Sequence, residues 1–233
     1  MPYKTLSISR ITKVNSVLCS LRKVDKMTSI DMRSNLLFLR SGFETHGYYE
    51  FPLIRRLNLT TSHIRMIPIS KTKNNDTTNR RICGVHCFED DYRFTSLYNN
   101  PDKSLSKLSQ YAFLCTPDYS VYLDMDIWRQ IESIAHSRWV GAYWQNCGLS
   151  VIATVSWSGK KSFDFCFEGI EPGSDIAIGT IGCKKSKTEF LYGYDAMLDR
   201  LVPNKIICVG KPFPEMRGNV IYVPDEFPRR AVA

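Results

Sequence analysis

The chain has 233 residues, of which 43% are hydrophobic, and it carries a formal net charge of +8. This length and apolar content suit one domain, or one domain with an extension. No apolar run approaches the roughly 18 residues of a membrane span, and the N-terminus lacks the compact apolar block of a signal peptide, so we expect no membrane partner.

The positive charge is concentrated in the N-terminal third. Residues 1–82 contain 15 Lys and Arg against 5 Asp and Glu, whereas residues 83–233 contain 16 against 18. A basic arm beside a near-neutral body fits a nucleic-acid or nucleotide partner, although a solvated face would give the same counts. The candidate nucleic-acid-binding residues are Arg55, Arg56, Lys71, Lys73, Arg80 and Arg81.

The first 42 residues show no clear element, and we interpret them as an irregular basic extension of a single α/β domain at residues 43–233. Short apolar pieces between residues 47 and 70 include Pro52 and Pro68, which favour edge or irregular strands. Residues 71–81 are polar and rich in Asn and Thr, which predicts an exposed loop. The pair Cys83 and Cys87 around His86 resembles a metal cluster, but no second pair with zinc spacing follows, so buried thiols are the alternative.

Regular alternation begins after this loop. Short apolar or β-branched runs predict strands at residues 82–88, 112–115, 151–155, 175–181, 205–209 and 220–223. Helical spacing predicts helices after Pro101, between Asp124 and Cys147, and from Phe190 to Leu201, before Pro203. Residues 162–170 alternate as a strand does, but a packed loop or short helix is also consistent with them.

Strands that alternate with helices predict an α/β fold with a parallel sheet. We favour an open, mostly parallel sheet of five to six strands with helices on both faces. The alternative is an incomplete or irregular β/α barrel, in which apolar pieces near residues 36–70 add two or three strands.

Polar residues follow several predicted strands, where ligands bind in parallel sheets. Asp91 and Asp118 each come shortly after a strand, and Asp164 lies beyond the next. These carboxylates could be catalytic as general acid and base. Asp91 and Asp118 could also hold a divalent cation such as Mg²⁺. Helix caps and turns would use the same residues.

A second group of residues could bind a substrate. Arg138 and Gln145 are seven residues apart and share a helix face. Arg138 could grip an anion, and Trp144 offers a stacking surface. Ser156 and Trp157 follow a predicted strand and complete this group. The alternative is that the aromatic residues belong to the core and that Arg138 pairs with a carboxylate such as Asp164.

Six ordered segments resemble one uncharacterised family, a domain of unknown function met in bacteria, phages and mobile elements. They are EDDYRF (89–94), PDYSVYLDM (117–125), RWVGAYWQ (138–145), TVSW (154–157), SFDFCFEG (162–169) and GYDAMLDRLVPNKI (193–206). The resemblance implies an intracellular α/β protein of microbial or viral origin, in the host cytoplasm if viral. It implies no established activity.

Two functional hypotheses follow from these observations. The first is a metal-assisted hydrolase or transferase that acts on nucleotides or nucleic acid through the acidic strand ends. The second is a non-catalytic accessory protein that binds nucleic acid or a partner through its basic N-terminal third. The sequence contains no signal that fixes an oligomeric state.

Overall fold

The centre of the protein is a single sheet of seven parallel strands. The computed structural model describes residues 28–30, 39–61 and 63–225. In the sheet the strands lie in chain order, each beside the next along the chain. They are β3 (Arg65–Pro68), β4 (Cys83–His86), β5 (Phe113–Cys115), β6 (Val151–Thr154), β7 (Ile176–Gly179), β8 (Ile206–Val209) and β9 (Val220–Val223).

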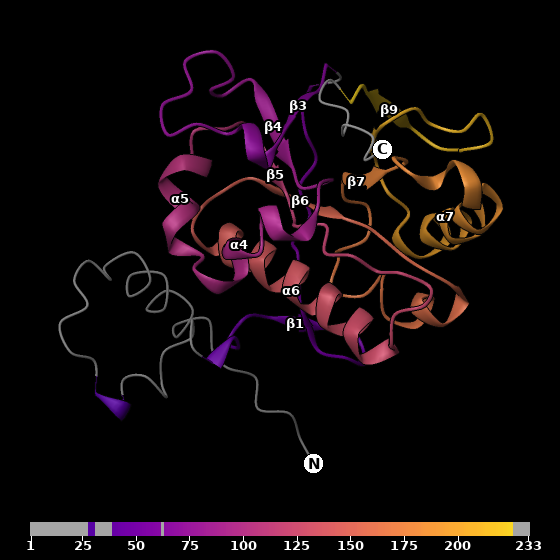
Figure 1. The fold of residues 1–233 in the computed structure, drawn as a ribbon, viewed down its shortest axis with the longest axis horizontal. Coiled ribbons are helices and arrows are strands. Elements are labelled where there is room, and N and C mark those ends of the chain that lie inside the picture. The colour runs from indigo at the N-terminus through magenta and orange to yellow at the C-terminus, as the bar shows by residue number, and fades with distance from the viewer. Residues whose placement is uncertain (1–27, 31–38, 62, 226–233) are drawn as a thin grey trace.

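The helices surround the outer face of this sheet (Figure 1). They are α4 (Ser96–Asn99), α5 (Asp102–Leu108), α6 (Ile127–Asn146) and α7 (Lys187–Leu201). The 3₁₀ turns are η1 (Ile69–Lys71), η2 (Asp91–Arg93), η3 (Lys160–Asp164) and η4 (Cys183–Ser186). A small antiparallel pair, β1 (Thr45–His46) and β2 (Phe51–Pro52), precedes the sheet, and β2 lies against α6.

On the inner face of the sheet, side chains from different strands pack against one another. Its apolar cluster contains strand residues such as Met66, Phe113, Ile152 and Ile207, and among the described residues it includes none from a helix. The two other clusters contain residues of α4 to α7 together with the alternate strand positions. Since helices cover only one face and the strands follow chain order, the architecture is an incomplete barrel and not a sheet between two helical layers.

Small and large side chains fit together inside this barrel. The Phe113 ring on β5 occupies the space beside Gly84 on β4, where a Cβ atom would lie 2.2 Å from the ring. Across the barrel the Phe88 ring lies 2.8 Å from the Cβ position of Gly179. The interior is therefore filled by side chains, as in other small parallel barrels.

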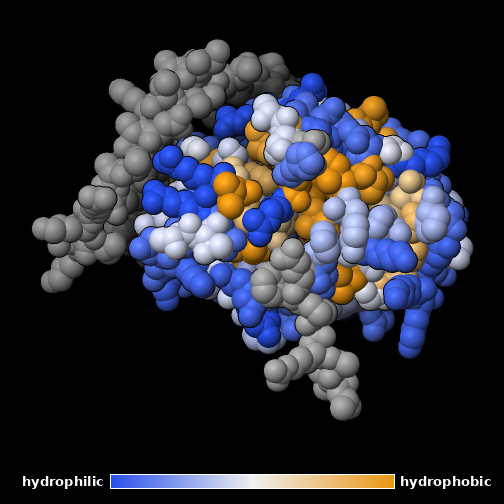
Figure 2. Space-filling view, turned by 90° about the horizontal axis from the view of Figure 1, so that it is seen from above, coloured by the Kyte–Doolittle hydropathy of each residue, from blue (hydrophilic) through white to orange (hydrophobic). Residues whose placement is uncertain are grey.

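The barrel is open between its two edge strands, β3 and β9, which pair with no further strand in the described part of the chain. On the side where β3, β4 and β9 lie in Figure 1, hydrophobic side chains gather in the middle of the surface with hydrophilic ones around them (Figure 2). The outer edges of β3 and β9 therefore have no strand partner among the described residues.

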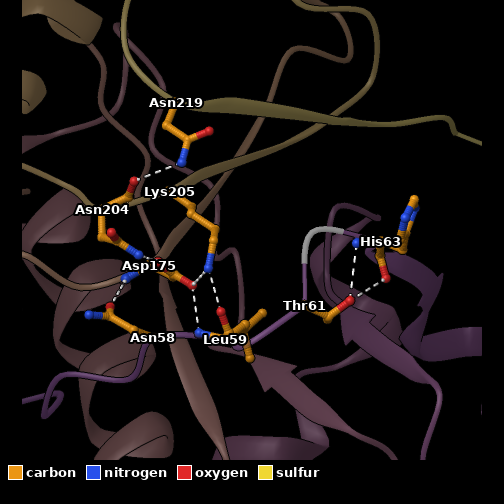
Figure 3. Close-up of polar contacts among 8 residues, drawn as sticks. All are labelled: Asn58, Leu59, Thr61, His63, Asp175, Asn204, Lys205 and Asn219. Carbon is orange, nitrogen blue, oxygen red and sulfur yellow. Dashed lines mark hydrogen bonds and ion pairs between the residues drawn. The ribbon is translucent and has the colours of Figure 1, made fainter.

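The segment from Ile54 to Thr61 crosses the end of the barrel at which the strands begin (Figure 3). Asp175, which precedes β7 and is fully buried, holds it there (Figure 3). One oxygen of Asp175 accepts the N–H of Leu59 (2.7 Å) and lies 3.5 Å from Lys205 Nζ, and the other accepts Asn204 Nδ2 (2.7 Å). This amino end of the barrel is therefore closed by a polar clamp.

The α/β class and the parallel sheet predicted from sequence are confirmed, and the strand order selects the barrel alternative. The six predicted strands correspond to β4 through β9. Pro68 lies in the edge strand β3, and residues 162–170 form a 3₁₀ turn and loop and not a strand. Within the described residues, no helix has both the length and the apolarity that crossing a membrane requires.

Candidate functional sites at the two ends of the barrel

Asp91 lies at the carboxyl end of the strands, as predicted, but its carboxylate already has protein partners. It begins η2 in the loop after β4. One oxygen accepts the hydroxyl of Ser120 (2.9 Å) and the other accepts the Ser120 backbone N–H (3.1 Å). Ser120 is in the loop after β5, so Asp91 ties two neighbouring loops together.

Asp118 is half-buried in the loop after β5, among thiols. Burial raises the pKa of Cys87 and Cys115, and the nearby charge of Asp118 raises it further. Burial and the same charge raise the pKa of Cys183, in the loop after β7. Asp118 therefore lies over the carboxyl mouth of the barrel. In this environment the three cysteines favour the neutral thiol form.

Asp164, the third predicted catalytic carboxylate, is exposed at the end of η3. In the part of the chain that the structure describes, no three or more His, Cys, Asp and Glu side chains form a group that could hold a metal ion.

Arg138 is placed behind the sheet and does not reach the carboxyl mouth. Its side chain is fully buried, and its guanidinium donates to the carbonyls of Glu168 (2.9 Å), Thr154 (3.2 Å) and Cys166 (2.8 Å). Burial lowers the pKa of Arg138 to about 10, which leaves it charged at neutral pH. These hydrogen bonds fix the loop after β6 to α6, and among the described residues Arg138 forms no ion pair with Asp164.

The two tryptophans predicted to bind a substrate, Trp144 and Trp157, pack in the hydrophobic core or against it. Trp144 is buried in the cluster between α6 and the sheet. Trp157 is half-buried and packs on Phe190 of α7, with its indole where a Cβ of Gly193 would be. Ser156 is half-buried beside it in the loop after β6. Of the predicted substrate-binding residues, Ser156 and Trp157 thus share the carboxyl end with Asp118, whereas Trp144 does not.

Gln145 lies at the opposite, amino end. Its Oε1 accepts the N–H of Arg55 (2.9 Å), while its Nε2 donates to the Arg55 carbonyl (2.8 Å) and to that of Val151 (3.3 Å). The structure thereby joins a predicted substrate-binding residue to a predicted nucleic-acid-binding residue. The separation of 90 residues hides this contact from sequence reasoning.

His86, the last residue of β4, entered the sequence analysis only as part of the Cys83–Cys87 arrangement that resembles a metal cluster. It is 4% exposed and faces into the barrel. Its Nδ1 accepts the N–H of Phe88 (3.2 Å), so the neutral ring holds its proton on Nε2. Burial lowers the pKa of His86 to about 4, which keeps the ring neutral at pH 7. Its position as the final residue of a buried strand was the available signal.

Most of the predicted basic residues gather at the amino end. Arg80 and Arg81 precede β4, and Arg81 N–H donates to the carbonyl of Gln110, just before β5 (2.9 Å). The carbonyl of Lys73 accepts Gln110 Nε2 (2.6 Å), which folds the exposed loop back onto the start of β5. Arg55 lies near the start of β6. The members of this group, which we call the basic end, are Arg55, Arg56, Lys73, Arg80 and Arg81, all exposed. Lys71 is exposed in η1, at the carboxyl end of β3.

Charge on the basic end is largely uncompensated. Among the described residues, Arg55, Lys73, Arg80 and Arg81 form no ion pair, while Arg56 lies 3.6 Å from Glu171. The nearby carboxylate of Asp76 is taken by Asn79 and Tyr111, and those hydrogen bonds lower its pKa to about 2.

An open cleft of about 270 Å³ lies within the basic end. One wall is the crossing segment and the other is the turn between α6 and β6. The lining residues are Arg55, Arg56, Leu57, Gln145, Gly148, Leu149, Ser150 and Val151. The sequence did not indicate the residues of this turn as a binding site. Its pattern around Ser150 predicts only the end of a helix and the start of a strand.

These features define an α/β protein built on an incomplete parallel barrel, with carboxylates and a buried histidine at one end and exposed guanidinium groups at the other. Residues 43–227 match the model of a family described as a domain of unknown function, DUF4417, and the chain belongs to this family. The resemblance predicted from the sequence segments is thus confirmed.

Two phage proteins are similar to the chain. The Gene 1 protein of Mycobacterium phage L5 is 33% identical over 180 residues, which cover 76% of this chain and 78% of that protein. The Gene 1 protein of Mycobacterium phage D29 is 32% identical over 185 residues, which cover 76% and 66%. No solved structure matches the chain.

Proposed function

We propose that this protein binds nucleic acid through its basic end, without catalysing a reaction on it. The observation that supports this is the set of exposed side chains at the starts of β4 and β6, where Arg55, Arg80 and Arg81 have no acidic partner among the described residues. Guanidinium groups bind phosphate oxygens in pairs, and several on one surface follow a phosphate backbone.

The acidic carboxyl end supports a metal-assisted hydrolase less well. Asp91 is engaged by Ser120 and Asp164 points to solvent, so a cation held by Asp91 and Asp118 would have to displace an existing contact. Mg²⁺ sites need several oxygen ligands in near-octahedral geometry. We therefore prefer the binding function.

The test measures binding of the full chain to a labelled DNA and a labelled RNA oligonucleotide across a salt series. In the triple variant Arg55→Ala, Arg80→Ala, Arg81→Ala, we expect the slope of log K against log salt to flatten by about 0.9 per lost phosphate contact on duplex DNA, hence by about 3. The matched control removes three exposed charges from the carboxyl end: Lys184→Ala, Lys185→Ala and Lys211→Ala.

The control triple variant should retain the affinity and the salt slope of the natural chain. Equal weakening of both triple variants would contradict the assignment to the basic end, because it would mean that only net charge matters. A natural chain without measurable, salt-dependent binding to either oligonucleotide would contradict the proposed function itself.

A further inference from the structure

The cleft at the basic end has a wall that is fixed by side-chain hydrogen bonds. Gln145 holds both the N–H and the carbonyl of Arg55, at 2.9 Å and 2.8 Å. Glu171 accepts the backbone N–H of Arg56 at 2.8 Å. Two successive arginines are thus held by their backbones at the mouth of the cleft, so binding would not need to order this segment.

The polar groups of the cleft differ in how far the protein already uses them. The Gln145 amide is hydrogen-bonded to backbone groups of Arg55 and Val151, and the Arg56 guanidinium lies 3.6 Å from Glu171. Within the described residues, the Arg55 guanidinium has no ion pair and the Ser150 hydroxyl makes no hydrogen bond. The cleft therefore offers a cation and a neutral hydroxyl to a ligand.

The remaining lining is apolar, and the volume is small. Leu57 and Leu149, both partly exposed, line the cleft together with Gly148, beside which the Cβ position is open, whereas the Val151 side chain is buried. About 270 Å³ is just below the usual range for drug-sized ligands. An apolar surface beside one free guanidinium fits a ligand with a flat or carbon-rich part and a single anionic group.

A purely structural role for the arginines at this cleft is the alternative explanation of their position. Helix α6 ends at Asn146, and cations favour the negative end of a helix dipole. A dipole partner needs neither a cleft nor a free hydroxyl, however. It also predicts a loss of stability on removing Arg55, whereas a binding role predicts a loss of affinity.

We propose that this cleft holds one nucleotide unit, with its phosphate on Arg55 and its sugar and base against Leu57 and Leu149. This rests on the proposed nucleic-acid binding and assigns it a position for a single nucleotide. The other basic residues then contact the phosphates that follow.

The test titrates the full chain with deoxyadenosine 5′-monophosphate, with deoxyadenosine, and with inorganic phosphate, each followed by isothermal calorimetry. We expect the mononucleotide to bind more tightly than either fragment. Ser150→Trp would fill the cleft without removing a charge and should weaken mononucleotide binding about tenfold or more. Ser106→Trp, at an exposed position on α5, is the control and should have no effect.

Arg55→Ala is the second variant. It should weaken mononucleotide binding by a similar factor and leave the melting temperature of the protein unchanged. Equal affinity for inorganic phosphate and mononucleotide would overturn the proposal, and so would wild-type affinity in Ser150→Trp. A fall in melting temperature with unchanged affinity in Arg55→Ala would assign it to the helix dipole instead. Binding of long oligonucleotides that survives Ser150→Trp, with mononucleotide binding also intact, would refute the cleft and leave the proposed function standing.

Discussion

Replacing Asp175 by alanine should remove the clamp at the amino end of the barrel. The carboxylate is fully buried and accepts from Leu59 N–H and Asn204 Nδ2, with Lys205 Nζ at 3.5 Å. The substitution leaves these donors without an acceptor and a lysine that is only 17% exposed without its carboxylate. Breaking a buried ion pair in this way costs about 3–5 kcal/mol, a large part of the roughly 5–15 kcal/mol that stabilises a typical domain.

Urea unfolding followed by tryptophan fluorescence would measure this loss. Asp175→Asn keeps one acceptor for Leu59 N–H and should lose about half as much. The control is Asp195→Ala, which breaks the exposed pair with Arg217, 56% and 69% exposed, and should cost at most about 1 kcal/mol. The reasoning is refuted if Asp175→Ala destabilises the protein no more than Asp195→Ala does.

Two further substitutions test buried polar residues. His86 has a folded pKa of about 4, below its ordinary 6.5, so the unfolded chain binds more protons as the pH falls. The free energy of unfolding should therefore drop by about 2 kcal/mol between pH 7 and pH 5 because of His86. Urea titrations of His86→Gln at both pH values should show a drop that is smaller by this amount. An equal drop in the natural chain and in His86→Gln would contradict the prediction. Arg138→Lys cannot reach the three carbonyls of Glu168, Thr154 and Cys166 at once, and each carbonyl left alone costs about 1–3 kcal/mol. Hydrogen exchange should become faster in residues 155–170, and unchanged protection there would contradict the anchoring role.

The sequence was sufficient for the elements because their signals are local. β-Branched runs such as Val151–Thr154 form strands wherever they are buried on both sides. The edge position of β3 was also readable, because Pro68 cannot donate to a neighbouring strand. Arg80 and Arg81 could be placed beside the start of a strand because they directly precede the apolar run at residues 82–88.

Strand order and the partners of polar residues were decided only by the tertiary structure. Nothing local distinguishes a sheet with helices on both faces from a barrel, since both use the same strand–helix alternation. Arg138 illustrates the same limit: its spacing from Gln145 predicted a shared ligand face, yet one side chain satisfies buried carbonyls and the other holds Arg55 at the amino end.

The sequence by itself therefore determined which segments are strands and helices, which family the chain resembles, and where its charge is concentrated. The tertiary structure alone decided that Asp91 ties two loops, that Asp175 closes the barrel, and that a cleft forms between Arg55 and Ser150. The physical reason is that strand and helix formation depends on neighbours along the chain. The fate of a polar side chain depends instead on which distant donors and acceptors folding brings within about 3 Å of it.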